Sequence, residues 1–185
     1  LGTARTLTVN SLSATDCDFR DITIAGAAAG SSQTRAGNCG GNSGITFPVA
    51  KTVYWVNAAS GNWQGTAPNG AWSDVSGGSP SVNNFPLAQD IAIINDAGGS
   101  ASTTITINTA YNLPTINMSG RTSAITLATG TVAPSIYGSI TLGSGVTLSG
   151  TGMITFSGRG TQTITCNGRT FTQPITVNSI SGTVQ

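Results

Sequence analysis

A short pattern, one threonine between two apolar residues, recurs along nearly the whole chain of 185 residues. Its copies lie at 7–9, 22–24, 45–47, 105–107, 125–127, 140–142, 146–148, 154–156, 164–166 and 175–177. Successive side chains of an extended strand point to opposite faces, so each copy places two apolar side chains on one face and a threonine on the other. The pattern predicts a chain made of many short, half-buried strands.

The spacing of the copies predicts how these strands are arranged. From Ile105 onward they recur roughly every 10 residues, with Gly, Ser, Asn or Pro between them, which is typical of stacked short strands. We therefore expect a β-solenoid or β-helix-like stack with about two strands in each turn of ~20 residues. An antiparallel sandwich built from Asn-Gly hairpins is the alternative. The expected inward residues are Ile105, Ile107, Ile116, Met118, Ile125, Leu127, Ile140, Leu142, Val146, Leu148, Ile154, Phe156, Ile164, Cys166, Ile175 and Val177.

The composition agrees with an all-β chain and argues against several partners. Only 7% of the residues are charged, against the ~25% of an ordinary soluble domain, so Thr, Ser, Asn and Gly must form most of the surface. The net charge of +1 gives no footprint for nucleic acid. No apolar run approaches the ~18 residues of a membrane span, so we expect no membrane insertion.

Three regions follow from the distribution of residue types. Residues 1–50 form an N-terminal strand-and-loop segment, in which 25–44 is expected to be a long loop and a change of apolar parity predicts a corner or a bulge at Arg20-Asp21. Residues 51–102 form an irregular segment rich in tryptophan. Residues 103–185 carry the regular β-solenoid repeats, which we expect to continue beyond 185 in a longer parent protein, because an open last turn needs a cap or a partner.

The middle segment contains all three tryptophans, Trp55, Trp63 and Trp72. Large aromatic side chains gathered in one segment can fill one end of a core, as tryptophans usually do. They can also form a platform that stacks on sugars. Both interpretations stay open from the sequence.

The same segment carries a resemblance. The run 54–63, followed by Trp72-Ser73, by 77–80, and by Pro86 with 90–93, resembles a "YWVGG-GNW…WS" module of bacteriophage tail-associated proteins, which is also seen in β-solenoid surface adhesins. Residues 156–171 resemble the rung that often follows that module, and residues 17–22 a piece found upstream of it. The likeness covers most of the chain. It implies a β-helical virion protein of a tail, fibre or host-contacting appendage, and it brings no catalytic residues.

The inventory of reactive side chains predicts that the chain is not an enzyme. It has no histidine, and all six acidic residues are aspartates, of which none lies after Asp96. We predict no catalytic residue, no bound cofactor and no metal site. The trio Asp16, Asp18 and Asp21 could supply oxygen ligands to Ca²⁺, but a solvated strand face has the same pattern. Arginines 121, 159 and 169 each follow a glycine and are expected to be solvated surface charges; a row along one edge of the coil that contacts an anionic glycan is the alternative.

Three cysteines leave at least one unpaired. Cys17 and Cys39 could form a disulfide if the loop around Cys39 folds back, whereas a chain assembled in a bacterial cytoplasm would keep both thiols reduced. Cys166 occupies an inward position and is expected to be a small core residue.

Taken together, these features predict a non-enzymatic structural component of a phage virion that forms a rigid oligomeric scaffold. We expect self-association, with a homotrimer as the first choice, and contacts with other virion proteins and with a host surface glycan. A glycan-binding adhesin on the bacterial surface, or secreted, is one alternative. Part of a polysaccharide depolymerase, with carboxylates supplied from elsewhere, is another.

Overall fold

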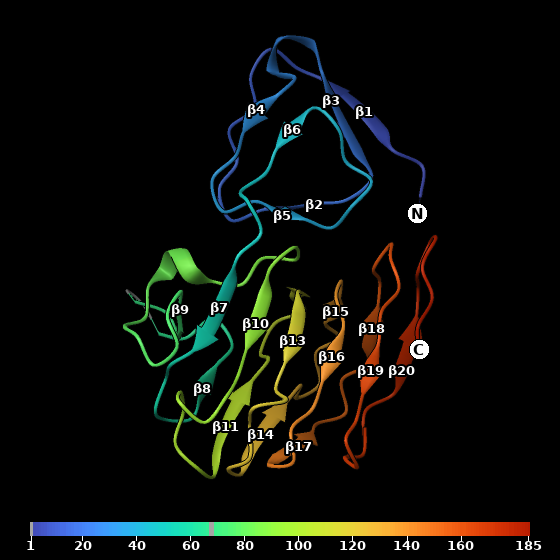
Figure 1. Ribbon diagram of the computed structural model, residues 1–185. Coiled ribbons are helices and arrows are strands. Elements are labelled where there is room, and N and C mark those ends of the chain that lie inside the picture. The colour runs from blue at the N-terminus through green and yellow to red at the C-terminus, as the bar shows by residue number, and fades with distance from the viewer. Residues whose placement is uncertain (1, 67–68) are drawn as a thin grey trace.

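A computed structural model describes residues 2–66 and 69–185 and consists almost entirely of short strands and loops (Figure 1). The described helical structure is two 3-10 turns of three residues, η1 (Gly26–Ala28) and η2 (Val82–Asn84). The prediction of an all-β chain is therefore confirmed.

Residues from Thr52 onward form three sheets whose strands run parallel (Figure 1). The first contains β7 (Thr52–Trp55), β10 (Ile91–Ile93), β13 (Thr115–Asn117), β16 (Ile140–Thr141) and β19 (Ile164–Thr165), with β9 (Trp72–Ser73) antiparallel to β7. The second contains β8 (Gly61–Asn62), β11 (Thr103–Thr106), β14 (Ile125–Ala128) and β17 (Val146–Ser149). The third contains β12 (Asn112–Leu113), β15 (Ser135–Ile136), β18 (Ile154–Phe156) and β20 (Ile175–Val177).

The chain visits these sheets in rotation. From β10 to β16, each strand pairs with the third strand after it. Ile116 pairs with Ile140, 24 residues further on, and Ile125 pairs with Val146, 21 residues further on. Three strands therefore occupy each repeat, so the prediction of two is wrong. The antiparallel hairpins of the alternative sandwich are also contradicted, since these pairs are parallel.

The missed strands are β12 and β15, which have only two residues each. Each contributes a single inward apolar side chain, Leu113 or Ile136, and both are 1% exposed. A strand with one inward residue cannot show the alternation by which the longer strands are recognised. The sequence pattern therefore misses two of the four strands of the third sheet.

The core contains most of the side chains that the alternation places inside. Twelve of the sixteen expected inward residues are buried, namely Ile105, Ile107, Ile116, Met118, Ile125, Leu127, Ile140, Leu142, Val146, Leu148, Ile154 and Phe156. Ile164 and Cys166 are half-buried. Ile175 and Val177 are 42% and 54% exposed, although their pairing partners Ile154 and Phe156 are buried, so the prediction is wrong for these two. Within the described residues no strand packs on the outer side of β20, so its side chains lack the cover that β20 gives to β18.

Residues 2–50 form a smaller set of parallel pairs. In this N-terminal segment β1 (Arg5–Thr8) pairs with β3 (Ile22–Ala25), β2 (Asp18–Phe19) with β5 (Gly37–Asn38), and β4 (Ser31–Ser32) with β6 (Ile45–Thr46). The stretch 25–44 contains β4 and β5, so it is not the long loop expected. The corner at Arg20-Asp21 is confirmed, because Asp21 has a left-handed φ of 55° between β2 and β3.

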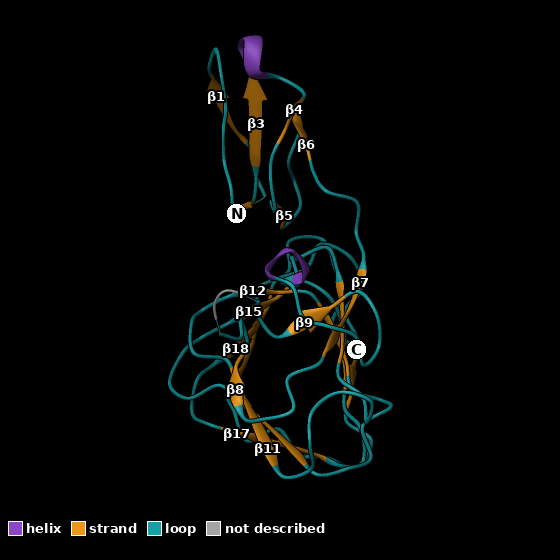
Figure 2. Cartoon of the chain, turned by 90° about the vertical axis from the view of Figure 1, so that its left-hand side faces the viewer, coloured by secondary structure: helices purple, strands orange, loops and turns teal. Residues whose placement is uncertain are grey.

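The N-terminal segment lies beyond the ends of the strands of the larger part, above β7, β10, β13 and β15 in Figure 1 (see also Figure 2), and its contacts extend from Asn83 to Arg159. Gln89 joins the two parts. Its side-chain oxygen accepts a hydrogen bond from the backbone N–H of Asn38, and its side-chain nitrogen donates to the carbonyl oxygen of Ala36 at 3.1 Å. Polar contacts, rather than a shared apolar core, hold this part of the junction.

Arg121 is the most completely buried charged side chain among the described residues, with no exposed surface. Its guanidinium group donates hydrogen bonds to six carbonyl oxygens, those of Asn95, Gly98, Gly99, Ser100, Ser123 and Ala124. These bonds fasten two loops of adjacent repeats to one another. The expectation that Arg121 is a solvated charge is therefore wrong, because its side chain is buried and its five N–H donors are matched by carbonyl groups of the two loops.

Asp96 supports the same pair of loops from the outside. It lies 3.5 Å from the guanidinium of Arg121 and accepts hydrogen bonds from the hydroxyl and N–H of Thr122 and from the N–H of Ser123. These hydrogen bonds lower the pKa of Asp96 to about 2. The bond from the hydroxyl of Thr122 has the largest effect, and the bond from the N–H of Ser123 has the second largest.

We predict that Arg121→Ala lowers the free energy of unfolding by about 3–5 kcal/mol, because it removes a buried cation and leaves buried carbonyl groups without donors. Chemical denaturation followed by circular dichroism measures the change. The matched control is Arg169→Ala, since Arg169 is exposed and its loss should alter stability by less than about 0.5 kcal/mol. Equal stability of the two variants would contradict the role given to Arg121.

We predict a second effect at acid pH. The folded pKa of Asp96 lies below the ordinary value of 3.8, so its charged form stabilises the fold above pH 4 and this contribution is lost as the pH falls towards 2. Urea unfolding of the wild type and of Asp96→Asn between pH 5 and pH 2 measures it. The wild type should be the more stable at pH 5, and the two curves should converge near pH 2. A constant difference across the range would rule out the titration of Asp96 as the cause.

Candidate functional site

A cavity of about 380 Å³ lies between the N-terminal segment and the larger part of the chain, and we call it the junction cavity. Its lining comes from both parts: Asp16, Asp18, Arg35, Gln64, Gly65, Gly70, Ala71, Trp72, Ser81, Val82, Phe85, Leu87 and Tyr111. A volume in the range of ~300–1,000 Å³ is typical of sites for small molecules.

The apolar part of the lining comes from the larger part of the chain. Phe85 follows η2, and Tyr111 directly precedes β12. Their ring centroids are 5.5 Å apart with the planes tilted by 59°, and both side chains are half-buried. Leu87, which is 8% exposed, and the edge of the buried Trp72 complete this side. The cavity therefore has an aromatic wall that remains partly accessible.

The polar part of the lining comes mainly from the N-terminal segment. Arg35 donates two hydrogen bonds to the carboxylate of Asp16, one of them at 2.8 Å from its Nη2, and a third to the side-chain oxygen of Asn83. The pKa of Asp16 lies below its usual value, mainly because its carboxylate accepts the hydrogen bonds from Arg35. The pair is charged on both sides at neutral pH and fixes the orientation of Arg35.

Two further hydrogen bonds fix polar groups at the cavity. Asn112 donates to Oδ2 of Asp18 at 2.8 Å, and the hydroxyl of Tyr111 donates to Oε1 of Gln64 at 2.5 Å. Burial of the carboxyl group raises the pKa of Asp18, and the bond from Asn112 acts in the opposite direction. Asp18 and Asn112 are 94 residues apart in sequence, so their contact depends on how the two parts pack.

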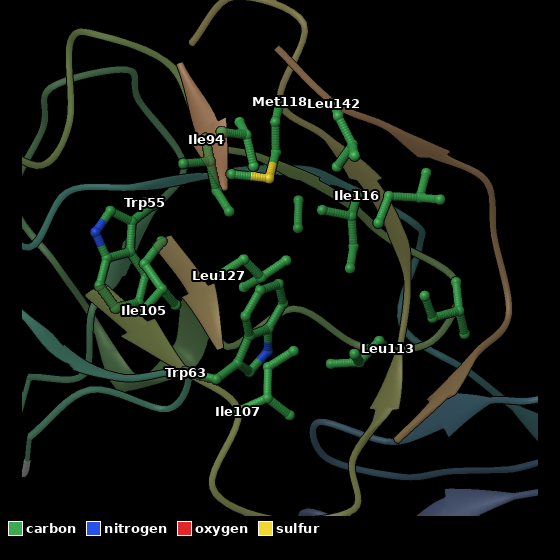
Figure 3. Packing of buried hydrophobic residues seen from close by; sticks show 14 of the residues in the cluster. Trp55, Trp63, Ile94, Ile105, Ile107, Leu113, Ile116, Met118, Leu127 and Leu142 are labelled. Carbon is green, nitrogen blue, oxygen red and sulfur yellow. The ribbon is translucent and has the colours of Figure 1, made fainter. Parts of the chain in front are cut away.

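The three tryptophans are part of the core. Trp55, Trp63 and Trp72 are at most 1% exposed, and Figure 3 shows Trp55 and Trp63 among the inward side chains Ile105, Ile107 and Leu127. The ring centroid of Trp72 lies 5.4 Å from that of Trp55 and 4.7 Å from that of Trp63. The interpretation as a core plug is borne out. None of these indole rings presents an open face on which a sugar could stack, so the alternative is wrong for this chain.

The acidic trio is divided among separate partners. Asp16 pairs with Arg35, Asp18 with Asn112, and Asp21 with Arg159. Arg20, next to Asp21, donates to the hydroxyl of Tyr137 at 3.1 Å and lies over its ring. Within residues 2–66 and 69–185, no group of three or more Asp, Glu, His or Cys side chains is placed to hold a metal ion. Arg159 is half-buried in an ion pair rather than free at the surface.

The cysteines are three free thiols, so the disulfide between Cys17 and Cys39 is not formed. The register of β2 and β5 explains why. Asp18 pairs with Gly37 and Phe19 with Asn38, so Cys17 precedes the paired residues and Cys39 follows them, a stagger of roughly 10 Å along the strands. Cys17 is exposed, whereas Cys39 is buried. Burial, followed by the nearby charge of Asp18, raises the pKa of Cys39 to about 12.

Most residues of the junction cavity were missed by the sequence analysis. Gln64, Phe85 and Tyr111 belong to no motif and come from separate loops, and Asn112, which donates to Asp18, is the first residue of β12. Asp16 and Asp18 were noticed as an acidic cluster, but their partners could not be inferred. At the cavity, Tyr111 and Phe85 are half-buried, whereas the tryptophans, which drew attention in the sequence, are at most 1% exposed.

Comparison of the chain with models of known protein families, with curated proteins and with solved structures gave no match. None of the helical segments in the described part of the chain is long and apolar enough to span a membrane.

We predict that the cysteines react at very different rates. In the native protein at pH 8, Cys17 should react rapidly with Ellman's reagent, because it is exposed. Cys39 should react only on unfolding, because its thiol is buried and protonated at this pH. Cys17→Ser should remove the fast phase. If unfolding alone exposes no further reactive thiols, and the count rises only after a reductant is added, the protein contains a disulfide and the prediction is wrong.

Proposed function

We propose that the chain is a β-solenoid module that acts as a rigid, non-enzymatic scaffold in a multi-copy assembly. The observation that carries this proposal is the pairing of each strand from β10 to β16 with the third strand after it. Such pairing makes each repeat a platform for the next, so the structure can grow along one axis without change of register. A rod of this kind suits presentation and contact better than chemistry.

The outward residues support the same proposal. On the second sheet, Thr104, Thr126 and Thr147 form one outward row across β11, β14 and β17. On the first, Asn117, Thr141 and Thr165 form another. Uncharged rows of this kind can pack against a second copy without burying unpaired charges.

The edge of β20 supports self-association. Ile175 and Val177 are exposed at positions where the previous strand buries its side chains, and the outer edge of the strand is unpaired within the described residues. Exposed apolar side chains on a free strand edge favour addition of another strand, either from a following repeat of a longer chain or from a second copy. We propose that three copies associate and that β20 takes part in the contact.

The proposed setting is a tail, fibre or host-contacting appendage of a bacteriophage, where the chain would contact other virion proteins and a host surface glycan. The resemblance of residues 54–63 and 156–171 to phage tail-associated proteins motivates it. A glycan-binding adhesin of a bacterial surface is the second candidate, and the junction cavity is the observation that favours it.

We predict that the protein sediments at three times the chain mass of 18.5 kDa. Val177→Asp should shift it to the monomer with unchanged circular dichroism, because a charge would enter the proposed contact. The matched control is Val75→Asp, since Val75 is 61% exposed and lies away from β20. Analytical ultracentrifugation over a hundredfold range of concentration measures both. A wild type that is monomeric throughout, or equal dissociation by the two variants, would contradict the proposal.

A further inference from the structure

We propose that the junction cavity binds a neutral pyranose unit of a carbohydrate. This deepens the second candidate function above, the glycan-binding module, and rests on it; the cavity is lined by one copy of the chain and does not require the oligomer. Its lining brings together the N-terminal segment, the segment around η2 and the residue before β12.

The aromatic wall fits one side of such a ligand. The C–H bonds on one face of a pyranose carry small positive charges, and the face of an aromatic ring is negative. Tyr111 and Phe85 are half-buried and pack against each other, so their rings are held in place before a ligand arrives. A wall that is already ordered loses little side-chain entropy on binding.

The polar side fits the hydroxyl groups. Asp18 accepts one hydrogen bond on Oδ2, from Asn112, which leaves a second lone pair on that atom, whereas its Oδ1 packs against Gly37 of β5. Gln64 uses Oε1 for Tyr111, which leaves its side-chain N–H groups able to donate. A polar group that is held in place by one hydrogen bond within the protein, and can still form another with a ligand, orients a sugar in a largely apolar site.

The charges of the lining select among sugars. Asp16 and Asp18 face a single cation, Arg35, which is already paired with Asp16. One negative charge is therefore in excess at the cavity. A uronic acid or sialic acid would place a second carboxylate beside Asp18, and this repulsion disfavours it. A neutral pyranose meets no such cost.

The test is saturation-transfer NMR of the wild-type protein with glucose, galactose, mannose, rhamnose and N-acetylglucosamine, each at millimolar concentration, and with glucuronate and N-acetylneuraminate as acidic counterparts. At least one neutral sugar should receive saturation through its ring protons, and the acidic sugars should receive none. Tyr111→Ala should weaken binding of that sugar at least tenfold, and Gln64→Ala, at an exposed position, should weaken it without affecting the fold.

The matched control is Tyr54→Ala on β7, since Tyr54 is also half-buried but is not part of the cavity lining. It should leave binding within twofold of the wild type. No saturation of any neutral sugar, preferential binding of an acidic sugar, or binding that survives both Tyr111→Ala and Gln64→Ala would overturn the proposal. A monomeric protein that still binds the sugar would contradict the proposed trimer and leave the cavity assignment standing.

Discussion

The structure depends on hydrogen bonding between backbone groups of strands that are one repeat apart. Most strands have only two to four residues, so no single pair is stable by itself. Stability comes from many such pairs in the same register, with Ile125 above Val146 and Leu127 above Leu148. A slip by one residue would turn every inward side chain outward, and this strongly fixes the alignment.

Buried polar side chains hold the loops between the strands. Arg121 supplies donors to carbonyl groups of two loops, and the buried carboxylate of Asp90 accepts hydrogen bonds from the N–H groups of Lys51 and Leu87. Gln162, which is 1% exposed, donates to the carbonyl groups of Ile136 and Gly138 and accepts from the N–H of Gly158. A chain with so few charged residues places several of its strongest hydrogen-bonding groups inside, because the turns leave backbone groups that the sheets cannot satisfy.

The sequence was sufficient to predict the strands with two inward residues, because the alternation along Ile125–Leu127 or Ile154–Phe156 indicates an extended strand with both apolar side chains on one face. It could not reveal β12 and β15, whose single inward residues form no pattern. It also could not distinguish Arg121 from Arg169, because both follow a glycine and only the packing of loops separates a buried cation from a solvated one. The junction cavity was beyond prediction for the same reason: Asp18 and Asn112 are 94 residues apart in sequence and meet only through the packing of the two parts.

In the proposed scaffold, the parallel sheets provide length and rigidity, and the N-terminal segment supplies most of the polar lining of a partly aromatic cavity at one end of them. The central claim is the pairing of strands one repeat apart. NMR scalar couplings across hydrogen bonds test it most directly. The account predicts couplings from the N–H of Ile116 to the carbonyl of Ser139 and from Ile140 to Thr163, whereas couplings between strands adjacent in sequence would contradict it.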